Sequence, residues 1–164
     1  MATLTTNINY LQPTGFKVIM DRKHFPNLTF FATSVLHPNM SLNFSEVQYR
    51  RVNVRQPGDK LTFGDLTCNI IMDEDMTAYK EMYDWMVSLV QTKQRDQSDR
   101  TDTVRPTSSD ISVLALTSHN NKSKEIKYYD AIPTSLGDVS FETVGGDQYL
   151  TFPASFSFTY FDVL

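Results

Sequence analysis

The sequence is poor in several features that would point to particular protein classes. It has one cysteine, Cys68, so an internal disulfide is excluded, and no apolar run is long enough to span a bilayer. The start, MATLTTNINYLQ, lacks the basic-then-apolar layout of a signal peptide. Apolar content of 40% and charged content of 21% argue against global disorder. We therefore expect a soluble, cytoplasmic-type protein with one domain, residues 1–164.

Recognisable catalytic patterns are also missing. His24, His37 and His119 are far apart in the sequence and belong to no HxxxH or HExxH pattern, and there is no GxSxG and no phosphate-binding glycine loop. Cys68 alternates with apolar neighbours, which predicts a buried, inert thiol rather than a nucleophile. The sequence therefore predicts no enzyme, cofactor or metal site, although an active site assembled from distant residues stays open.

Aromatic residues are abundant, with 11 Phe, 8 Tyr and 1 Trp against only 6 Gly, and this composition favours β structure. Period-two alternation and turn signals predict strands rather than long helices over most of the chain. Polar stretches predict loops at 39–46 and 92–110, a turn at 56–60, and further turns near 120 and 146. The expected strands are 15–22, 28–36, 47–54, 61–72, 111–117, 124–132, 139–144 and 149–163, with a bulge near Gly64 in the fourth.

One helix is expected at about residues 74–91. Apolar side chains recur there at spacings of three and four, which is the pattern of an amphipathic helix. The pattern predicts that Tyr79, Tyr83 and Met86 pack against the sheet. Trp85 should lie next to this stripe or just outside it.

Three acidic residues, DED at 73–75, separate the fourth strand from this helix. Either Asp73 or Asp75 is well placed to cap the helix N-terminus, where acidic side chains also favour the helix dipole. The alternative is a divalent-cation site, which would need more oxygen ligands than one short acidic turn supplies. We therefore interpret DED as a cap.

Charge is distributed unevenly along the chain, whose net charge is −4. Basic residues concentrate in 47–60, acidic residues concentrate in 73–84, and no lysine or arginine follows Lys127. Separated positive and negative regions can repeat head to tail between copies. Nucleic-acid binding is weakly supported, because the basic stretch is short and the rest of the chain would repel phosphate.

Two segments carry a resemblance to a known family. GDKLTFGDLTCNIIMDEDMTAYKEMYDWM resembles the strand, acidic turn and helix ending in DW of tail tube proteins from contractile-tail bacteriophages (myoviruses). KEIKYYDAIPTSLGDVSFETVGGDQYLTFPASFSFTYFDV resembles the same family's KEI strand, PT-x-x-G turn and closing aromatic strand. Order and spacing agree over roughly residues 58–163.

The resemblance implies a mainly β fold, a β-sandwich or partial barrel with one flanking helix. It implies that six copies close into a ring with a continuous inner β-barrel, and that rings stack into a tube. Such a tube lies inside a contractile sheath in the virion tail and ends at baseplate and terminator proteins. It holds the tape-measure protein and conducts DNA without binding it specifically. Assembly is expected in the cytoplasm of the host bacterium.

Two alternatives stay open. The first is the inner tube of a type VI secretion system or another phage-derived injection machine, or a tube-like baseplate component. The second is an unrelated β-sandwich that serves as a binding module or hydrolase. A protein that remains a monomer and never forms rings would favour the second alternative.

Contacts between stacked rings are expected in the basic stretch. In the family, the corresponding strand-connecting loop reaches the neighbouring ring, and this places Arg50, Arg51, Arg55 and Asp59 at the inter-ring contact. The alternative is that these are ordinary solvated side chains on paired strands.

The lumen is expected to be lined by acidic and neutral polar groups. The resemblance places Asp65, Glu125 and Asp138 near the inner barrel, although sequence alone does not fix which residues of a strand face the channel. The alternative is that the acids lie on the outer surface and that the lumen is neutral.

Overall fold

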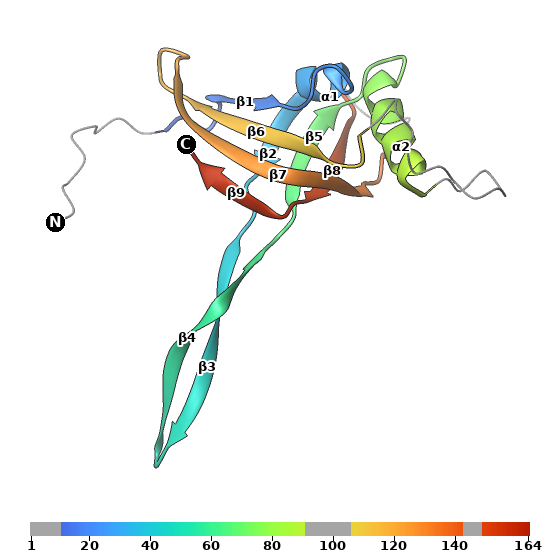
Figure 1. Ribbon diagram of the computed structural model, residues 1–164. Helices are drawn as coiled ribbons and strands as arrows, with labels where there is room; N and C mark the ends of the chain where they lie inside the picture. The colour runs from blue at the N-terminus through green and yellow to red at the C-terminus, as the bar shows by residue number, and fades with distance from the viewer. Residues whose placement is uncertain (1–10, 91–105, 143–148) are drawn as a thin grey trace.

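The computed structural model describes residues 11–90, 106–142 and 149–164. It consists of a β body with two helices and a long two-stranded hairpin that projects away from the body (Figure 1). The mainly β fold with one longer helix was predicted from the sequence, and this prediction is confirmed.

The elements follow one another in an order that differs from the expected one mainly before residue 64. The strands are β1 (Phe16–Ile19), β2 (Ala32–Leu36), β3 (Met40–Tyr49), β4 (Val52–Phe63), β5 (Leu66–Ile71), β6 (Ser109–Leu116), β7 (Lys122–Leu136), β8 (Thr151–Ser157) and β9 (Tyr160–Val163). The helices are α1 (Pro26–Phe30) and α2 (Thr77–Val90).

The body strands form one antiparallel sheet in the order β1-β6-β7-β8-β5-β2, and β9 also pairs with β7. The long strand β7 connects two parts of this sheet. Its first part pairs with β6 and β9, and its last part pairs with β8. We call β1, β6, β9 and the first part of β7 the β6 half, and β2, β5, β8 and the last part of β7 the β8 half.

The core is one hydrophobic cluster to which both halves and α2 contribute. Every second residue of β5 and β8 is fully buried, as period-two alternation requires. From the β6 half come Val18, Ile111 and Tyr128, and from α2 come Met82 and Trp85. Each half therefore has one face toward the core and one face away from it.

The residues of α2 that face the core agree only in part with those predicted from the sequence. Tyr79 and Met86 pack against the core, and the Tyr79 ring meets Phe152 edge-on. Tyr83 was expected in the core but is 41% exposed. Trp85, expected at the edge of the stripe, is completely buried. The buried residues of α2 are Ala78, Met82 and Trp85, one position before each predicted residue, and α2 packs against both the sheet and α1.

Asp73 acts as the expected cap of α2. Its carboxylate accepts hydrogen bonds from the Thr77 hydroxyl and from the Ala78 backbone N–H. The Thr77 bond is the main reason that the pKa of Asp73 lies below its usual value. The capped helix begins at Thr77 rather than at 74, because residues 74–76 form the turn that precedes it.

The segment 39–63 corrects the sequence prediction most strongly. The predicted loop 39–46 is strand β3, the predicted turn 56–60 lies inside β4, and the predicted strand 47–54 contains the hairpin turn at Arg50 and Arg51. Nearly every residue of β3 and β4 is exposed, so no buried face produces a recognisable alternation.

Gly58 explains why the PG pair in β4 is not a turn. The two strands shift register between Leu42 and Phe44, and Gly58 lies at this irregularity. A Cβ at Gly58 would come within 2.5 Å of the Asn43 carbonyl oxygen. The glycine therefore serves a close backbone approach in the ribbon rather than a change of chain direction.

Three further boundaries differ from expectation. The predicted strand 28–36 is α1 followed by β2, and the predicted strand 149–163 breaks into β8 and β9. Residues 139–142 form no strand, and the rest of the predicted strand 139–144 lies outside the described residues. The predicted bulge near Gly64 is the break between β4 and β5. Of the predicted loop 92–110, only 106–110 is described, and β6 already begins at Ser109.

Candidate assembly surfaces

The hairpin of β3 and β4 is the first candidate surface. At about 3.3 Å per residue, the ten residues of β3 reach about 33 Å. A two-stranded hairpin alone is marginally stable in water. An exposed ribbon of this length is therefore a structure that a second molecule would cover.

The tip of the hairpin carries two of the four residues predicted at the inter-ring contact. Arg50 and Arg51 form the turn, and Arg50 has a φ of 55°, in the left-handed region that favours glycine. Arg55 lies farther up the ribbon, where its guanidinium pairs with Glu46 at 3.0 Å and lies over the Phe44 ring. The structure thus gathers two arginines at the tip and gives Arg55 an internal partner, while Asp59 lies in β4 near the register shift.

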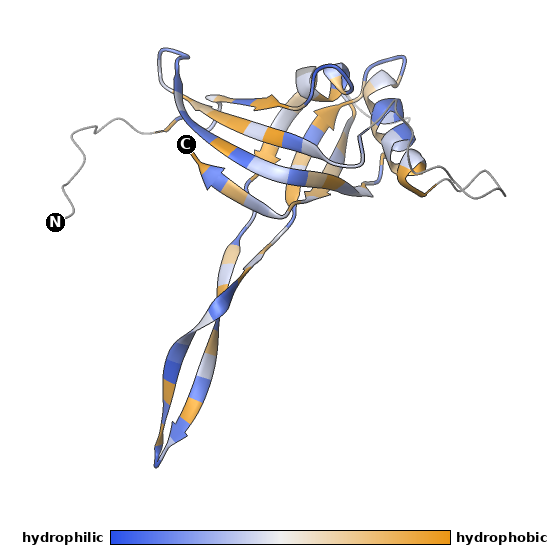
Figure 2. Ribbon diagram, viewed as in Figure 1, coloured by the Kyte–Doolittle hydropathy of each residue, from blue (hydrophilic) through white to orange (hydrophobic). Residues whose placement is uncertain are grey.

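The distal part of the hairpin has two different faces. Cross-strand pairing puts Val47 opposite Val54 and Tyr49 opposite Val52 on one face. These four side chains are 44–67% exposed. The opposite face carries the Glu46–Arg55 ion pair and the Gln48–Asn53 pair. Figure 2 shows hydrophobic and hydrophilic bands alternating along this ribbon. We call the Val47, Tyr49, Val52 and Val54 surface the apolar hairpin face.

An aromatic cluster holds the root of the hairpin against the body. Phe63, at the end of β4, lies 5.7 Å from Phe158 and 5.5 Å from Phe161 between ring centroids. His37, just before β3, meets Phe161 edge-on at 5.1 Å, and its Nδ1 lies 2.6 Å from the Tyr128 hydroxyl. Tyr128 is fully buried, so the root is anchored in the core.

The face of the β6 half that points away from the core is rich in charge. Cross-strand register places Lys17, Asp110, Glu125, Lys127 and Asp162 on this face. Lys127 pairs with Asp110 at 2.9 Å, and Lys122 pairs with Glu125 at 2.5 Å. The Lys122 ammonium is the main reason that the pKa of Glu125 is lowered. Opposite charges are therefore interleaved here, and we call this surface the charged face.

The corresponding face of the β8 half has a different chemistry. Its outward strand residues carry small hydroxyl and amide groups with a few apolar side chains, and among these described residues none is charged. They are Thr33, Ser34, Leu36, Thr67, Asn69, Ile71, Ile132, Thr134, Ser135, Thr151, Pro153, Ser155 and Ser157. We call this surface the uncharged face.

Many polar groups of the uncharged face are already satisfied by one another. The Asn69 amide donates to Ser34 Oγ at 2.9 Å, and the hydroxyls of Thr67 and Ser155 lie 3.3 Å apart. Thr33 donates to the Asn69 carbonyl, and Thr134 donates to the Ser155 carbonyl. These side chains therefore offer few strong, unpaired groups to an approaching molecule.

The residues predicted to line the lumen do not gather in one place. Glu125 lies on the charged face, Asp65 lies between β4 and β5 at the hairpin root, and Asp138 follows the end of β7. They belong to separate parts of the body. Glu125 also has lysine neighbours, so it does not present an isolated negative charge.

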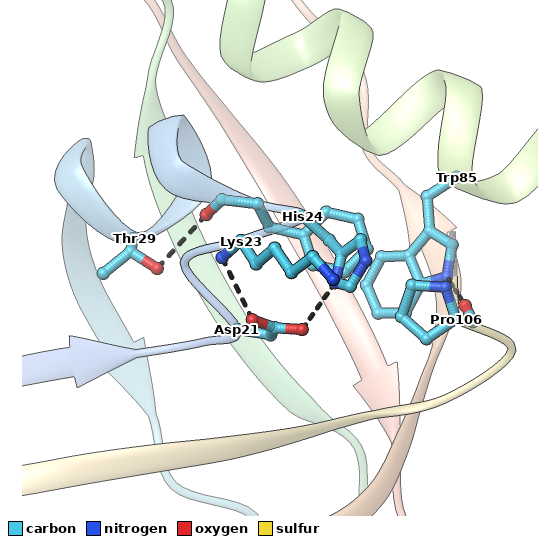
Figure 3. A network of polar contacts seen from close by, with 7 residues as sticks. Asp21, Lys23, His24, Thr29, Trp85 and Pro106 are labelled. Carbon is cyan, nitrogen blue, oxygen red and sulfur yellow. Dashed lines mark hydrogen bonds and ion pairs between the residues drawn. The ribbon is translucent and has the colours of Figure 1, made fainter. Parts of the chain in front are cut away.

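The turn after β1 leads into α1, which packs against α2 at the end of the body away from the hairpin (Figure 1), and Figure 3 shows the polar contacts of this turn. Asp21 accepts hydrogen bonds from the Lys23 backbone and from Nδ1 of His24. From α2, Glu81 accepts hydrogen bonds from the Asn27 amide and the Leu28 backbone N–H. These contacts are structural, because they fix α1 against α2.

The thiol and the acidic and histidine side chains of the described ranges form no reactive or metal-binding cluster. Cys68 is fully buried, and burial raises the pKa of its thiol to about 12. Within the described ranges, no three His, Cys, Asp or Glu side chains are arranged to hold a metal ion. None of the helices in these ranges is both long and apolar enough to cross a membrane.

Comparison with solved structures shows where this fold occurs. A chain from the sheath–tube complex of an extracellular contractile injection system, in its extended state, matches with a TM-score of 0.69 at 16% identity over 99% of both chains. A chain from the tube-terminating cap of the anti-feeding prophage matches with a TM-score of 0.69 at 15% identity, over 98% of this chain and 95% of that chain. A type six secretion system protein matches with a TM-score of 0.52 at 12% identity, over 90% of this chain and 81% of that chain.

A family model described as phage tail tube protein matches residues 3–164. No curated protein sequence matches the chain. Because the family match covers almost the whole chain, this chain belongs to the phage tail tube protein family. It is a structural protein of a tail tube, as the sequence resemblance predicted, and a component of the virion tail.

Proposed function

We propose that this chain is the repeating protomer of a hollow tube, in which hexameric rings stack inside a contractile sheath and conduct DNA during ejection. The observation that carries this proposal is the combination of the family match over residues 3–164 with a long, exposed hairpin. The hairpin has no role in the packing of its own body beyond the root, so its length serves another molecule. The protein has a structural role and no catalytic one.

A second copy is the partner that the charges of the chain favour. Residues 40–63 contain four basic and two acidic residues, which gives a net charge of +2. The whole chain has a net charge of −4, so the remainder carries −4 − 2 = −6. The positive hairpin of one copy is therefore attracted to the negative body of another copy, whereas two hairpins, or two bodies, repel each other. Head-to-tail contacts of this kind propagate into open-ended tubes.

The tip arginines are the contact residues that we place between rings. Holding Arg50 in a left-handed conformation costs about 1 kcal/mol relative to glycine. The two-residue turn of the hairpin requires such a conformation at this position, so the tip is a defined turn that holds both arginines at the end of the ribbon. We propose that Arg50 and Arg51 bind the adjacent ring, with Arg55 and Asp59 supporting the ribbon. Glutamate at both tip positions should leave rings that no longer elongate, and normal tubes from that double variant would place the contact elsewhere.

Other tail components complete the proposed assembly. The sheath would surround the tube, the tape-measure protein would occupy it before DNA does, and baseplate and terminator proteins would close its ends. We place assembly in the cytoplasm of the host bacterium. Support comes from the family and from the sheath–tube and tube-terminating structures that share the fold.

A second candidate is the inner tube of a phage-derived injection system. It is favoured by the fold matches to extracellular contractile injection systems and to a type six secretion protein. The two candidates share the tube and differ in what passes through it. Capsid genes beside the gene for this chain would identify a phage, and their absence beside effector genes would identify an injection system.

Assembly itself tests the proposal. Purified protein, alone and with baseplate components, should form rings or tubes in negative-stain images and scatter as a high-mass species. The result that contradicts the proposal is an 18.8 kDa monomer under both conditions. Assembled tubes should also fail to retain DNA in a gel-shift assay at low salt, and tight, salt-sensitive retention would refute a non-binding conduit.

A further inference from the structure

We propose that the uncharged face of the β8 half lines the channel, and that the charged face of the β6 half points to the outside of the tube. This inference rests on the proposed tube function and adds the orientation of the subunit wall. It favours a neutral lumen over the acidic lumen expected from the charge of the tail of the sequence.

The chemistry of the two faces carries the choice. A polyanion that passes a wall with lysines is held by each one, because releasing counterions from phosphate favours every such contact. The charged face carries Lys17 and Lys127 among its acids. The uncharged face offers no group of either sign among its strand residues. The phosphates of DNA that moves along this face therefore meet no charged side chain of these strands that would hold or repel them.

The internal hydrogen bonds of the uncharged face strengthen this argument. Its Asn69 amide and several of its hydroxyls are already bound to neighbouring strands at 2.9–3.3 Å. Groups that are satisfied within the wall gain little by exchanging partners with a passing phosphate or base. The face is polar enough to stay wet and offers few unpaired groups to bind cargo.

The position of the hairpin points to the same half. β2 leads directly into β3, and β4 leads directly into β5, so the ribbon prolongs two strands of the β8 half (Figure 1). A ribbon that reaches the next ring would then extend this half along the tube axis. The half that is prolonged from ring to ring is the one suited to form an uninterrupted channel wall.

The opposite face has properties that suit an outer surface. Its carboxylates and ammonium groups form ion pairs on the surface, such as Lys127–Asp110 at 2.9 Å. Paired charges of both signs keep a surface hydrated and can contact a second charged protein. An enclosing sheath would meet this surface, whereas cargo would not.

Thiol labelling of assembled tubes tests the orientation. Ser135→Cys places a thiol on the uncharged face at an exposed position, and Asp110→Cys places one on the charged face, also exposed. Native Cys68 is fully buried and gives little background. In tubes, both variants should react with N-ethylmaleimide. Labelling by a maleimide on a long polyethylene glycol chain should be lost for Ser135→Cys and kept for Asp110→Cys.

A second cysteine variant and a measurement on unassembled subunits serve as controls. Asn69→Cys, on the same face, should reproduce the Ser135→Cys pattern and covers the case in which that variant fails to assemble. Unassembled subunits of every variant should react with both reagents. Bulky labelling of the Ser135 or Asn69 variants in tubes, or the reverse pattern for Asp110→Cys, would overturn the orientation. Wild-type protein that forms no tubes, either alone or with baseplate components, would instead overturn the proposed function on which the inference rests.

Discussion

Truncating Trp85 and Tyr83 to alanine in turn should give very different losses of stability. Trp85 is fully buried, lies 4.3 Å from Phe25 between ring centroids, and donates its indole N–H to the Pro106 carbonyl at 2.9 Å. Tyr83 lies two positions earlier in α2, so it points to a different side of the helix, and it is 41% exposed. The two aromatic residues therefore compare a core position with a surface position in one element.

The magnitudes follow from burial. Trp85→Ala should cost about 3–5 kcal/mol, the range for removing a large buried aromatic side chain. Trp85→Phe keeps most of the packing and leaves the Pro106 carbonyl without its donor, which should cost about 1–3 kcal/mol. Tyr83→Ala should cost less, about 1–2 kcal/mol, because 41% of the residue is already exposed in the folded state. Small domains are stable by about 5–15 kcal/mol, so of these three substitutions only Trp85→Ala should weaken the fold severely.

Urea denaturation of unassembled protein, followed by far-UV circular dichroism, measures these losses. Fluorescence is unsuitable because Trp85 is the only tryptophan in the chain. A Tyr83→Ala loss equal to or larger than the Trp85→Ala loss would show that the buried stripe of α2 has been placed on the wrong side.

Three further outcomes can be checked on the same protein. Serine at both Val47 and Val54 should leave ring formation intact and prevent elongation in negative-stain images, whereas alanine at Gln48 on the other hairpin face should elongate normally; equal behaviour would remove the apolar hairpin face from the contact. Cys68, with its pKa raised to about 12, stays protonated at pH 8 and should react with a thiol reagent only after urea unfolding, so rapid labelling of native protein would contradict its burial. Tyr128→Phe should lower stability by about 1 kcal/mol and increase hydrogen exchange at the hairpin root, and unchanged exchange would show that the hydroxyl contact to the root histidine does not anchor the ribbon.

Strands with one buried face were predictable from the sequence. Cys68 and Ile70 in β5, and Phe152 and Phe156 in β8, alternate with polar residues because one face meets the core and the other does not. The amphipathic period of α2 was visible for the same reason. The acidic cap at Asp73 followed from side-chain chemistry and needed no tertiary information.

The hairpin escaped prediction because it has no buried face in a single chain. Its polar residues at 39–46 and its Pro57–Gly58 pair are typical of loops when read locally. What makes them a ribbon is pairing across the register shift beside Gly58, which sequence spacing does not reveal.

The exact buried side of α2 also depended on tertiary contacts. The spacing of Tyr79, Tyr83 and Met86 was correct for a helix, yet Trp85 faces inward, where it contacts Phe25 and the Pro106 carbonyl from other parts of the chain. The positions of Asp65, Glu125 and Asp138 relative to a channel also depended on tertiary structure. Which strand face is free of the core depends on how β7 is shared between the two halves of the sheet.

High-resolution electron microscopy of assembled tubes tests the central claim most directly. We expect a hollow tube of stacked rings, in which the β3–β4 hairpin of each subunit lies on a subunit of the adjacent ring and the uncharged face of the β8 half surrounds the channel. A filament without a channel, or a tube in which the hairpins make no contact between rings, would contradict it.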